Sequence, residues 1–156
     1  MNGLTCCFIG HRDINKTKEL KTQLYKTIEN LIVDKNVTTF LFGSKSDFNG
    51  LCYETVTGMK EKYPHIKRVF VRAEYQFIDE SYTEYLQSLY EETCYPEKIK
   101  GAGKLSYVER NFYMIDNSDF CVFYYSKAYA PQNRKSGTET AFDYAKGRKK
   151  EIINLA

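Results

Sequence analysis

Residues 38–57 read Thr-Thr-Phe-Leu-Phe-Gly-Ser-Lys-Ser-Asp-Phe-Asn-Gly-Leu-Cys-Tyr-Glu-Thr-Val-Thr. An apolar, β-rich run over 37–42 breaks at Gly43 into a small polar loop, and a helical pattern with Glu54 in its early turns follows. Such a turn presents backbone N–H groups and the positive end of a helix dipole to a phosphate. We interpret the loop as a phosphate cradle. Because the residues match neither the P-loop pattern nor the GxGxxG fingerprint, an ordinary strand-to-helix turn is the alternative.

A second candidate site follows the first apolar run of the chain. Residues 4–9 are nearly all apolar, as in a parallel strand that is covered on both faces, and they end at Gly10-His11-Arg12-Asp13. Arginine can hold a phosphate with two parallel hydrogen bonds, and histidine can donate or accept a proton near neutral pH. The alternative is a solvated turn in which Asp13 caps the next helix.

The middle of the chain continues with helical and extended patterns. Residues 16–34 carry one apolar stripe of a helix, and 66–71 predicts a third strand. Residues 73–100 are less regular. Tyrosine and leucine spacing over 82–90 suggests a helix, whereas 94–103 resembles a loop, so we expect a lid or an insertion in this part.

Residues 105–117 predict a helix that carries a polar pair. The spacing of Val108, Phe112 and Ile115 places them on one buried helical face. Arg110 and Asn111 fall off that stripe, which leaves them available for a ligand.

A second turn from a strand into a helix follows. Residues 119–125 predict the fourth strand, and the polar loop after it ends in Ser136 and Gly137-Thr138, directly before a helix over 139–146. Residues 152–155 form the last expected strand. Small residues again stand where a helix begins.

Strands that alternate with helices along the whole chain predict a doubly wound α/β fold, with a mainly parallel sheet of five strands and helices on both faces. At 156 residues the chain is most simply one domain over 1–156. Ligands of such sheets bind beyond the carboxyl ends of the strands, near the point where the strand order reverses. The loops at 10–13, 43–50 and 136–138 all leave such ends, so we expect them to gather around one crevice.

The composition is that of an ordinary globular chain, with 42% hydrophobic and 28% charged residues and a net charge of +3. No segment has the apolar length of a membrane span, and the N-terminus lacks the pattern of an export signal. Five cysteines without a CxxC pair fit reduced thiols, so we expect a cytoplasmic protein. The two histidines are too few and too scattered for the usual zinc sites. We therefore expect no metal and no cofactor.

Charge and aromatic content narrow the class of partner. Lysine and arginine are interleaved with acidic residues, a pattern that does not favour nucleic-acid binding through a broad basic surface. The chain contains 14 tyrosines and 10 phenylalanines but no tryptophan. Some tyrosines could line a pocket and stack on a base, while most belong in a core or an interface.

Four stretches together resemble the motifs of one known family. They read Thr-Cys-Cys-Phe-Ile-Gly-His-Arg at 5–12, Gly-Ser-Lys-Ser-Asp-Phe-Asn at 43–49 with Glu54 five residues later, Arg-Asn-Phe-Tyr-Met-Ile-Asp at 110–116, and Gly137-Thr138 at a helix entry. In this order they resemble the SLOG superfamily, the Rossmann-like group that includes the LOG cytokinin-activating phosphoribohydrolases. The most similar branch is a bacterial and phage branch that opens with Thr-Cys-x-Phe-x-Gly-His-Arg. The resemblance implies a Rossmann-like fold and a ligand derived from a nucleotide.

Two departures from the family pattern bear on function. Ser44, Lys45 and Asp47 replace small residues, which would narrow the cradle and place a carboxylate beside it. LOG hydrolases carry Pro-Gly-Gly-x-Gly-Thr-x-x-Glu, in which the glutamate is implicated in catalysis, and Ala141 stands at that position here. The resemblance therefore does not supply the catalytic carboxylate.

Three functions fit these observations. The first is a sensor or sequestering module that binds a nucleotide or a nucleotide-derived ligand, such as ADP-ribose, NAD or a nucleoside monophosphate. The second is hydrolysis of the N-glycosidic bond of a nucleoside monophosphate, which needs a carboxylate near the ribose. Glu54 is the first candidate for that carboxylate, unless it serves only the helix dipole, and Asp116 is the second. The third is a structural or protein-interaction domain with a vestigial pocket.

The expected partner is a small-molecule nucleotide or nucleotide-sugar, and the superfamily also suggests a homo-oligomer. The candidate ligand-binding residues come from the four stretches and the loop before the last helix: Gly10, His11, Arg12, Gly43, Ser44, Lys45, Ser46, Arg110, Asn111, Ser136, Gly137 and Thr138.

Overall fold

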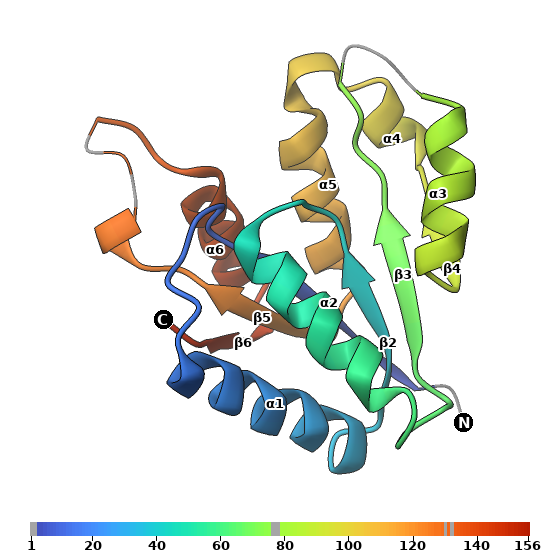
Figure 1. The fold of residues 1–156 in the computed structure, drawn as a ribbon. Helices are drawn as coiled ribbons and strands as arrows, with labels where there is room; N and C mark the ends of the chain where they lie inside the picture. The colour runs from blue at the N-terminus through green and yellow to red at the C-terminus, as the bar shows by residue number, and fades with distance from the viewer. Residues whose placement is uncertain (1–2, 76–78, 130, 132) are drawn as a thin grey trace.

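A computed structural model describes residues 3–75, 79–129, 131 and 133–156. Its centre is a parallel sheet of six strands in the order β4-β3-β2-β1-β5-β6 (Figure 1). The strands are β1 (Leu4–Gly10), β2 (Val37–Phe42), β3 (Lys67–Val71), β4 (Glu92–Cys94), β5 (Phe120–Tyr124) and β6 (Glu151–Asn154). The predicted α/β fold with a parallel sheet is confirmed, but the sheet has one strand more than the five expected.

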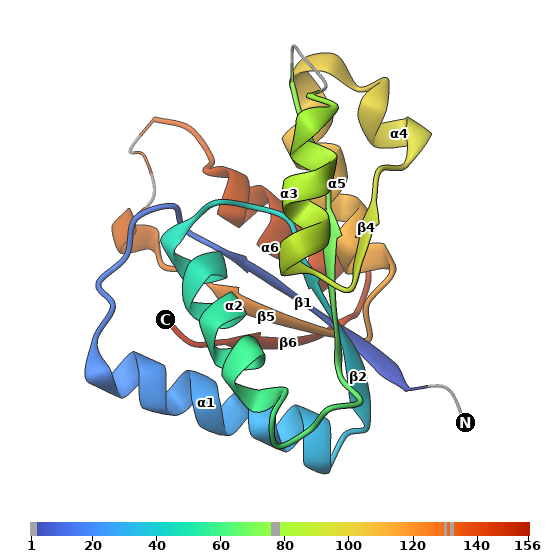
Figure 2. The ribbon, with the colours of Figure 1, turned by 45° about the vertical axis from the view of Figure 1, so that its right-hand side comes forward.

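Helices cover both faces of this sheet (Figure 2). One face carries α1 (Lys18–Val33), α2 (Asp47–Met59) and α3 (Ser81–Leu89), and the other carries α4 (Glu97–Lys100), α5 (Ser106–Asp116) and α6 (Gly137–Gly147). Two short 3-10 helices, η1 (Gly103–Leu105) and η2 (Lys127–Tyr129), lie in the connections. The arrangement is doubly wound and Rossmann-like, as the sequence predicted.

The continuous apolar runs of the central strands follow from this covering. Cys6 and Phe8 pack into the core on the α1 and α2 side, while Cys7 and Ile9 pack into the core on the α5 and α6 side. Successive side chains of a strand point to opposite faces, so a strand with helices on both sides needs apolar residues at every position. The first apolar run of the sequence therefore becomes the centre of the sheet.

The sixth strand lies between the helix expected over 82–90 and the loop expected over 94–103, in the stretch that the sequence left unassigned. β4 pairs in parallel with β3, with Val69 opposite Glu92 and Val71 opposite Cys94. Its three residues are polar or partly exposed, so the sequence contains no apolar run that would predict this strand. The strand forms because it pairs with β3. The helix suggested over 82–90 is confirmed as α3. Residues 76–78, within the expected lid or insertion, lie outside the described residues.

Two local predictions are corrected by the packing of the helices. Thr17 caps α1 by accepting a hydrogen bond from the Leu20 N–H (3.1 Å), so Asp13 is not the cap of that helix. In α5 the buried residues are Ser106, Arg110, Met114 and Ile115, whereas Val108 and Phe112 are only partly buried. Arg110 thus lies on the buried stripe of α5. The apolar pattern failed here because a polar contact across the molecule, described below, holds the arginine inward.

The chain reverses its direction across the sheet between β1 and β5. It runs from β1 outward through β2 and β3 to β4, then returns to the opposite side of β1 for β5 and β6. The connection after β1 leads to α1 on one face, and the connection after β5 leads to α6 on the other. Diverging connections leave a crevice at the carboxyl ends of these strands. No helix of the described residues has both the length and the apolar character of a membrane span.

Candidate functional site

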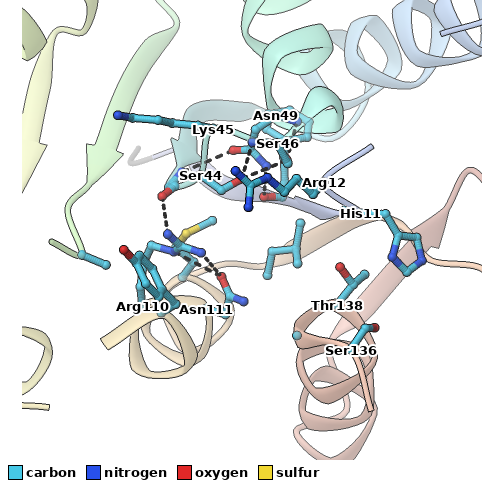
Figure 3. Close-up of a pocket in the computed structure, with 18 of the residues that line it drawn as sticks. His11, Arg12, Ser44, Lys45, Ser46, Asn49, Arg110, Asn111, Ser136 and Thr138 are labelled. Carbon is cyan, nitrogen blue, oxygen red and sulfur yellow. Dashed lines mark hydrogen bonds between the residues drawn. The ribbon is translucent and has the colours of Figure 1, made fainter. Parts of the chain in front are cut away.

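A cavity of about 1130 Å³ opens at the carboxyl edge of the sheet. It is bordered by the ends of β1, β2 and β3, by α5 and by the first turn of α6. Every residue that the sequence nominated for ligand binding, from Gly10 to Thr138, lies in its lining. In Figure 3 the labelled residues surround it, with Arg110 and Asn111 on one side and Ser136 and Thr138 on another. The three loops that are distant in sequence therefore meet around one cavity.

Neither of the proposed catalytic carboxylates lines this cavity. Glu54 is exposed on α2, and Asp116 is the exposed last residue of α5. The Asp116 carboxylate accepts a hydrogen bond from the Tyr144 hydroxyl (2.8 Å) and lies 3.7 Å from the Arg148 Nε. Among the described residues, the carboxylates in the lining are those of Asp13 and Glu74.

Most donors of the predicted cradle are paired within the chain. The Ser46 Oγ caps α2 by accepting from the Asn49 N–H (3.1 Å), and the Ser46 N–H donates to the Ser44 Oγ (3.3 Å). The Asp47 N–H donates to the Arg12 carbonyl (2.8 Å). In the described part of the chain, the N–H groups of Ser44 and Lys45 make no hydrogen bond. A ligand anion would therefore meet two backbone donors here and not a whole ring of them.

The Asp47 carboxylate does not lie beside the cradle as expected. It accepts a hydrogen bond from the Ile14 N–H (3.2 Å) and lies 4.0 Å from the Lys16 Nζ. These contacts fasten the connection after β1 to the start of α2. The substitution at this position thus puts no negative charge in the lining of the cavity.

Asn49 joins the ends of the two central strands, a role that the sequence did not indicate. Its side chain is buried, the Oδ1 accepts from the Gly43 N–H (3.3 Å), and the Nδ2 donates to the Phe8 carbonyl (3.1 Å). One amide therefore satisfies a donor of β2's end and an acceptor of β1. Its position within the Gly43-to-Asn49 motif was the only available signal.

Arg110 is the most unusual residue of the site. Only 8% of it is exposed, and burial lowers the pKa of its guanidinium to about 10. One Nη donates to the Gly43 carbonyl (2.6 Å), while the Nε and the other Nη donate to the Asn111 Oδ1 (3.3 and 3.2 Å). It forms no ion pair with any described carboxylate. Two of the five guanidinium N–H groups of Arg110 have no hydrogen-bond partner among the described residues.

His11 is a neutral, structural histidine in this conformation. The Ser126 N–H donates to its Nε2 (3.0 Å), so that nitrogen carries no proton and the ring proton lies on Nδ1. Burial lowers the pKa of His11, and the ring lies against that of Tyr129 with 5.3 Å between the centroids. The contact ties the loop after β1 to the loop after β5. His11 therefore lines the cavity as a neutral ring and contributes no positive charge to the site.

The first turn of α6 borders the cavity opposite Arg110. The Ser136 Oγ caps the helix by accepting from the Glu139 N–H (3.0 Å), and Thr138 is buried. The N–H groups of Gly137 and Thr138 make no hydrogen bond in the described part of the chain. Together with the helix dipole they form a second place for negative charge.

The charged and aromatic residues of the lining include several that the sequence did not nominate. The basic side chains are Arg12, Lys45, Arg110 and Arg134, and the tyrosines are Tyr75, Tyr82, Tyr107 and Tyr129. The Glu74 carboxylate is paired with Arg72, so basic charge dominates. Tyr107 lies one turn before Arg110, and Arg134 lies two residues before Ser136, so both belong to stretches that the sequence indicated, although neither residue was nominated. No group of three or more potential metal-ligating side chains occurs among the residues described.

The sequence matches a family model described as the YspA SLOG family over residues 7–156. None of the curated proteins matches it.

Proposed function

The chain belongs to the YspA SLOG family, and on this basis we propose that it binds a nucleotide or nucleotide-derived ligand at the carboxyl edge of the sheet, as a sensor or sequestering module. The family carries a coarse expectation of a nucleotide-related, Rossmann-like function. The cavity supports the proposal by its position at the point where the strand order reverses, which is where such sheets bind ligands.

The observation that carries the proposal is the buried, unpaired guanidinium of Arg110. A buried charge is unfavourable unless a partner compensates it. The Gly43 carbonyl and the Asn111 amide are neutral partners, and two N–H groups are free to bind an acceptor in the described structure. A phosphate oxygen would complete this arrangement with the charge-assisted geometry that arginine favours.

The size and the rings of the cavity favour a ligand larger than a free phosphate. A volume of about 1130 Å³ is slightly above the usual range for small-molecule sites, about 300 to 1,000 Å³. The Arg110 guanidinium lies 5.3 Å from the centroid of Tyr107, a half-exposed ring that also lines the cavity. A base could stack on such a ring while the attached phosphate binds the guanidinium. These features support a nucleotide over an inorganic anion.

The N-glycoside hydrolase stays the alternative function. Its proposed carboxylates, Glu54 and Asp116, lie outside the lining, so the geometry offers them no contact with a bound ribose. Base release must nevertheless be measured, because Glu74 and Asp13 do line the cavity.

The test is calorimetric titration and thermal melting with AMP, ADP-ribose and NAD. We expect at least one of them to bind and to raise the melting temperature, since a ligand at about 100 times its Kd stabilises a protein by about 2.7 kcal/mol. Arg110→Met should abolish this binding without loss of the fold, because methionine is a flexible apolar residue that can pack beside Met114.

Arg148→Met is the matched control. Arg148 is half-exposed at the end of α6, with its guanidinium 4.8 Å from the Tyr144 centroid, and it does not line the cavity. This variant should bind like the wild-type protein. Binding that survives in Arg110→Met, or no binding of any nucleotide, would refute the proposal. Chromatography of the same mixtures decides between the two activities, because free base would indicate the hydrolase.

A further inference from the structure

The cavity has an end that none of the family motifs reaches. Glu74, Tyr75 and Tyr82 form this end, after β3 and at the start of α3. Glu74 is partly buried, with 16% of its side chain exposed, and it is the less exposed of the two carboxylates in the described lining. It belongs to none of the stretches by which the sequence resembles the SLOG superfamily.

Contacts with the segments that follow β3 and β4 hold Glu74 in place. The Arg72 Nε donates to its Oε2 (2.7 Å) and an Arg72 Nη donates to its Oε1 (2.6 Å). The Asp79 N–H also donates to Oε1 (3.3 Å), and the Glu74 N–H donates to the Tyr95 hydroxyl oxygen (3.1 Å). Arg72 itself is buried and further donates to the Thr83 Oγ1 (2.7 Å). These hydrogen bonds and the ion pair with Arg72 hold the carboxylate in one orientation.

This carboxylate can still accept hydrogen bonds from a ligand. An ionised carboxylate offers about four acceptor positions, and donors among the described residues occupy three of them in Glu74, two on Oε1 and one on Oε2. It has no proton to donate, so its ligand partner must be a donor. The charge of Arg72 is compensated by Glu74, so this pair does not attract an anion. The two ends of the cavity therefore differ in chemistry, because Arg110 can bind a hydrogen-bond acceptor of the ligand and Glu74 can bind a hydrogen-bond donor.

The order of the strands places Glu74 beside the strand whose end holds Arg110. Glu74 follows β3, and Arg110 is bonded to Gly43 at the end of the adjacent β2. Phe42 pairs with Phe70, so Gly43 is level with Val71, and Glu74 lies three residues farther along the chain. Both groups line the same cavity. A ribose 5′-phosphate carries, in one molecule, the acceptor that Arg110 can bind and the donors that Glu74 can bind.

We infer that Glu74 accepts hydrogen bonds from the ribose hydroxyls of a nucleotide whose phosphate binds Arg110, and so selects ribonucleotides over their deoxy analogues. This assignment rests on the proposed function, and it names the part of the ligand that the β3 end of the cavity recognises. Glu74 is a specificity-determining residue in this arrangement, and no bond of the ligand is made or broken.

The test compares three probes by calorimetric titration: AMP, 2′,3′-dideoxy-AMP and inorganic pyrophosphate. The wild-type protein should bind AMP about tenfold more tightly than the dideoxy compound, which is the effect of one hydrogen bond to a charged group. The Glu74→Gln variant should lose most of this preference because its affinity for AMP falls. It should bind pyrophosphate as well as the wild-type protein or better, because a negative charge has been removed. Each preference is the ratio of two Kd values measured on the same protein, so an inactive, unfolded fraction of a variant affects both values equally and cancels in the ratio.

Glu91→Gln is the matched control, because Glu91, which directly precedes β4, pairs with Arg68 of β3. Glu91 accepts from the Nε (3.1 Å) and an Nη (2.6 Å) of Arg68 in a similar two-point pair, but it does not line the cavity. This variant should keep the wild-type preference for AMP. If wild-type protein binds both AMP compounds equally, or if Glu74→Gln keeps the preference, the inference is wrong while the proposed function stands. If none of the three probes binds, the inference is wrong, and the proposed function fails with it only if ADP-ribose and NAD do not bind either.

Discussion

The close contact between Gly43 and Arg110 leads to a prediction about Gly43→Ala. A Cβ atom at position 43 would lie 2.6 Å from the Met114 Sδ, 2.7 Å from the Arg110 Cδ and 3.1 Å from the Arg110 Nε. Both neighbouring side chains are buried, and the open space beside them is the cavity that they line. The added methyl group must therefore displace Arg110 or distort the end of β2.

The size of the effect follows from two contributions. Overpacking of a buried position costs about 1 to 3 kcal/mol. Displacement of the guanidinium also weakens its hydrogen bond to the Gly43 carbonyl (2.6 Å), and a bond of a charged donor contributes about 1.5 to 3 kcal/mol. Because the two changes share one movement, we expect a loss of about 2 to 4 kcal/mol. For a chain of this size that lowers the melting temperature by roughly 5 to 15 °C.

Differential scanning calorimetry and titration with AMP measure the two consequences. Gly58→Ala is the control, since a Cβ at that exposed helical position has no atom within 4 Å. It should leave AMP binding intact and stabilise the protein by about 0.4 to 1 kcal/mol through the lower entropy of the unfolded chain. Gly43→Ala should both melt earlier and bind AMP less tightly. A melting temperature equal to that of wild-type protein would refute the packing argument, and unchanged affinity would refute the role of Arg110's position.

Three further variants test contacts within and beside the site. Burial lowers the pKa of His11 from its ordinary 6.5. The neutral ring therefore contributes stability above that pH, and this contribution is lost as the pH falls through the folded-state pKa. Urea titrations should show that His11→Gln loses less stability than wild-type protein between about pH 7.5 and 5.5. Asn49→Ala leaves a buried donor and a buried acceptor unpaired and should cost about 2 to 4 kcal/mol in the same assay. Burial raises the pKa of Glu91, but the hydrogen bonds from Arg68 outweigh it and leave the pKa at about 2. Its contribution, on the order of 1 kcal/mol after solvent screening, should vanish as the pH falls from about 4.5 to 2, and Glu91→Gln should lack this acid-dependent step.

Local periodicity predicted most of the architecture. The apolar runs that became β1 and β2, and the apolar stripe that became α1, depend only on which side chains face a core, and that pattern repeats along the chain itself. β4 had no such pattern, because three residues at a sheet edge are stabilised by their pairing with β3. The buried stripe of α5 was misread for a related reason. A charged residue was assigned to the surface, whereas the Gly43 carbonyl holds Arg110 inward.

By itself the sequence determined the alternation of strands and helices, except for β4, and with it the meeting of the loops after β1, β2 and β5 at one edge. Only the tertiary structure decided which side chains of those loops face the cavity. Asp47 turns away toward Ile14, Glu54 faces solvent, and Arg110 contacts a carbonyl 67 positions distant. Hydrogen bonding and burial depend on neighbours in space, and residues far apart in the chain leave no periodic trace of such contacts.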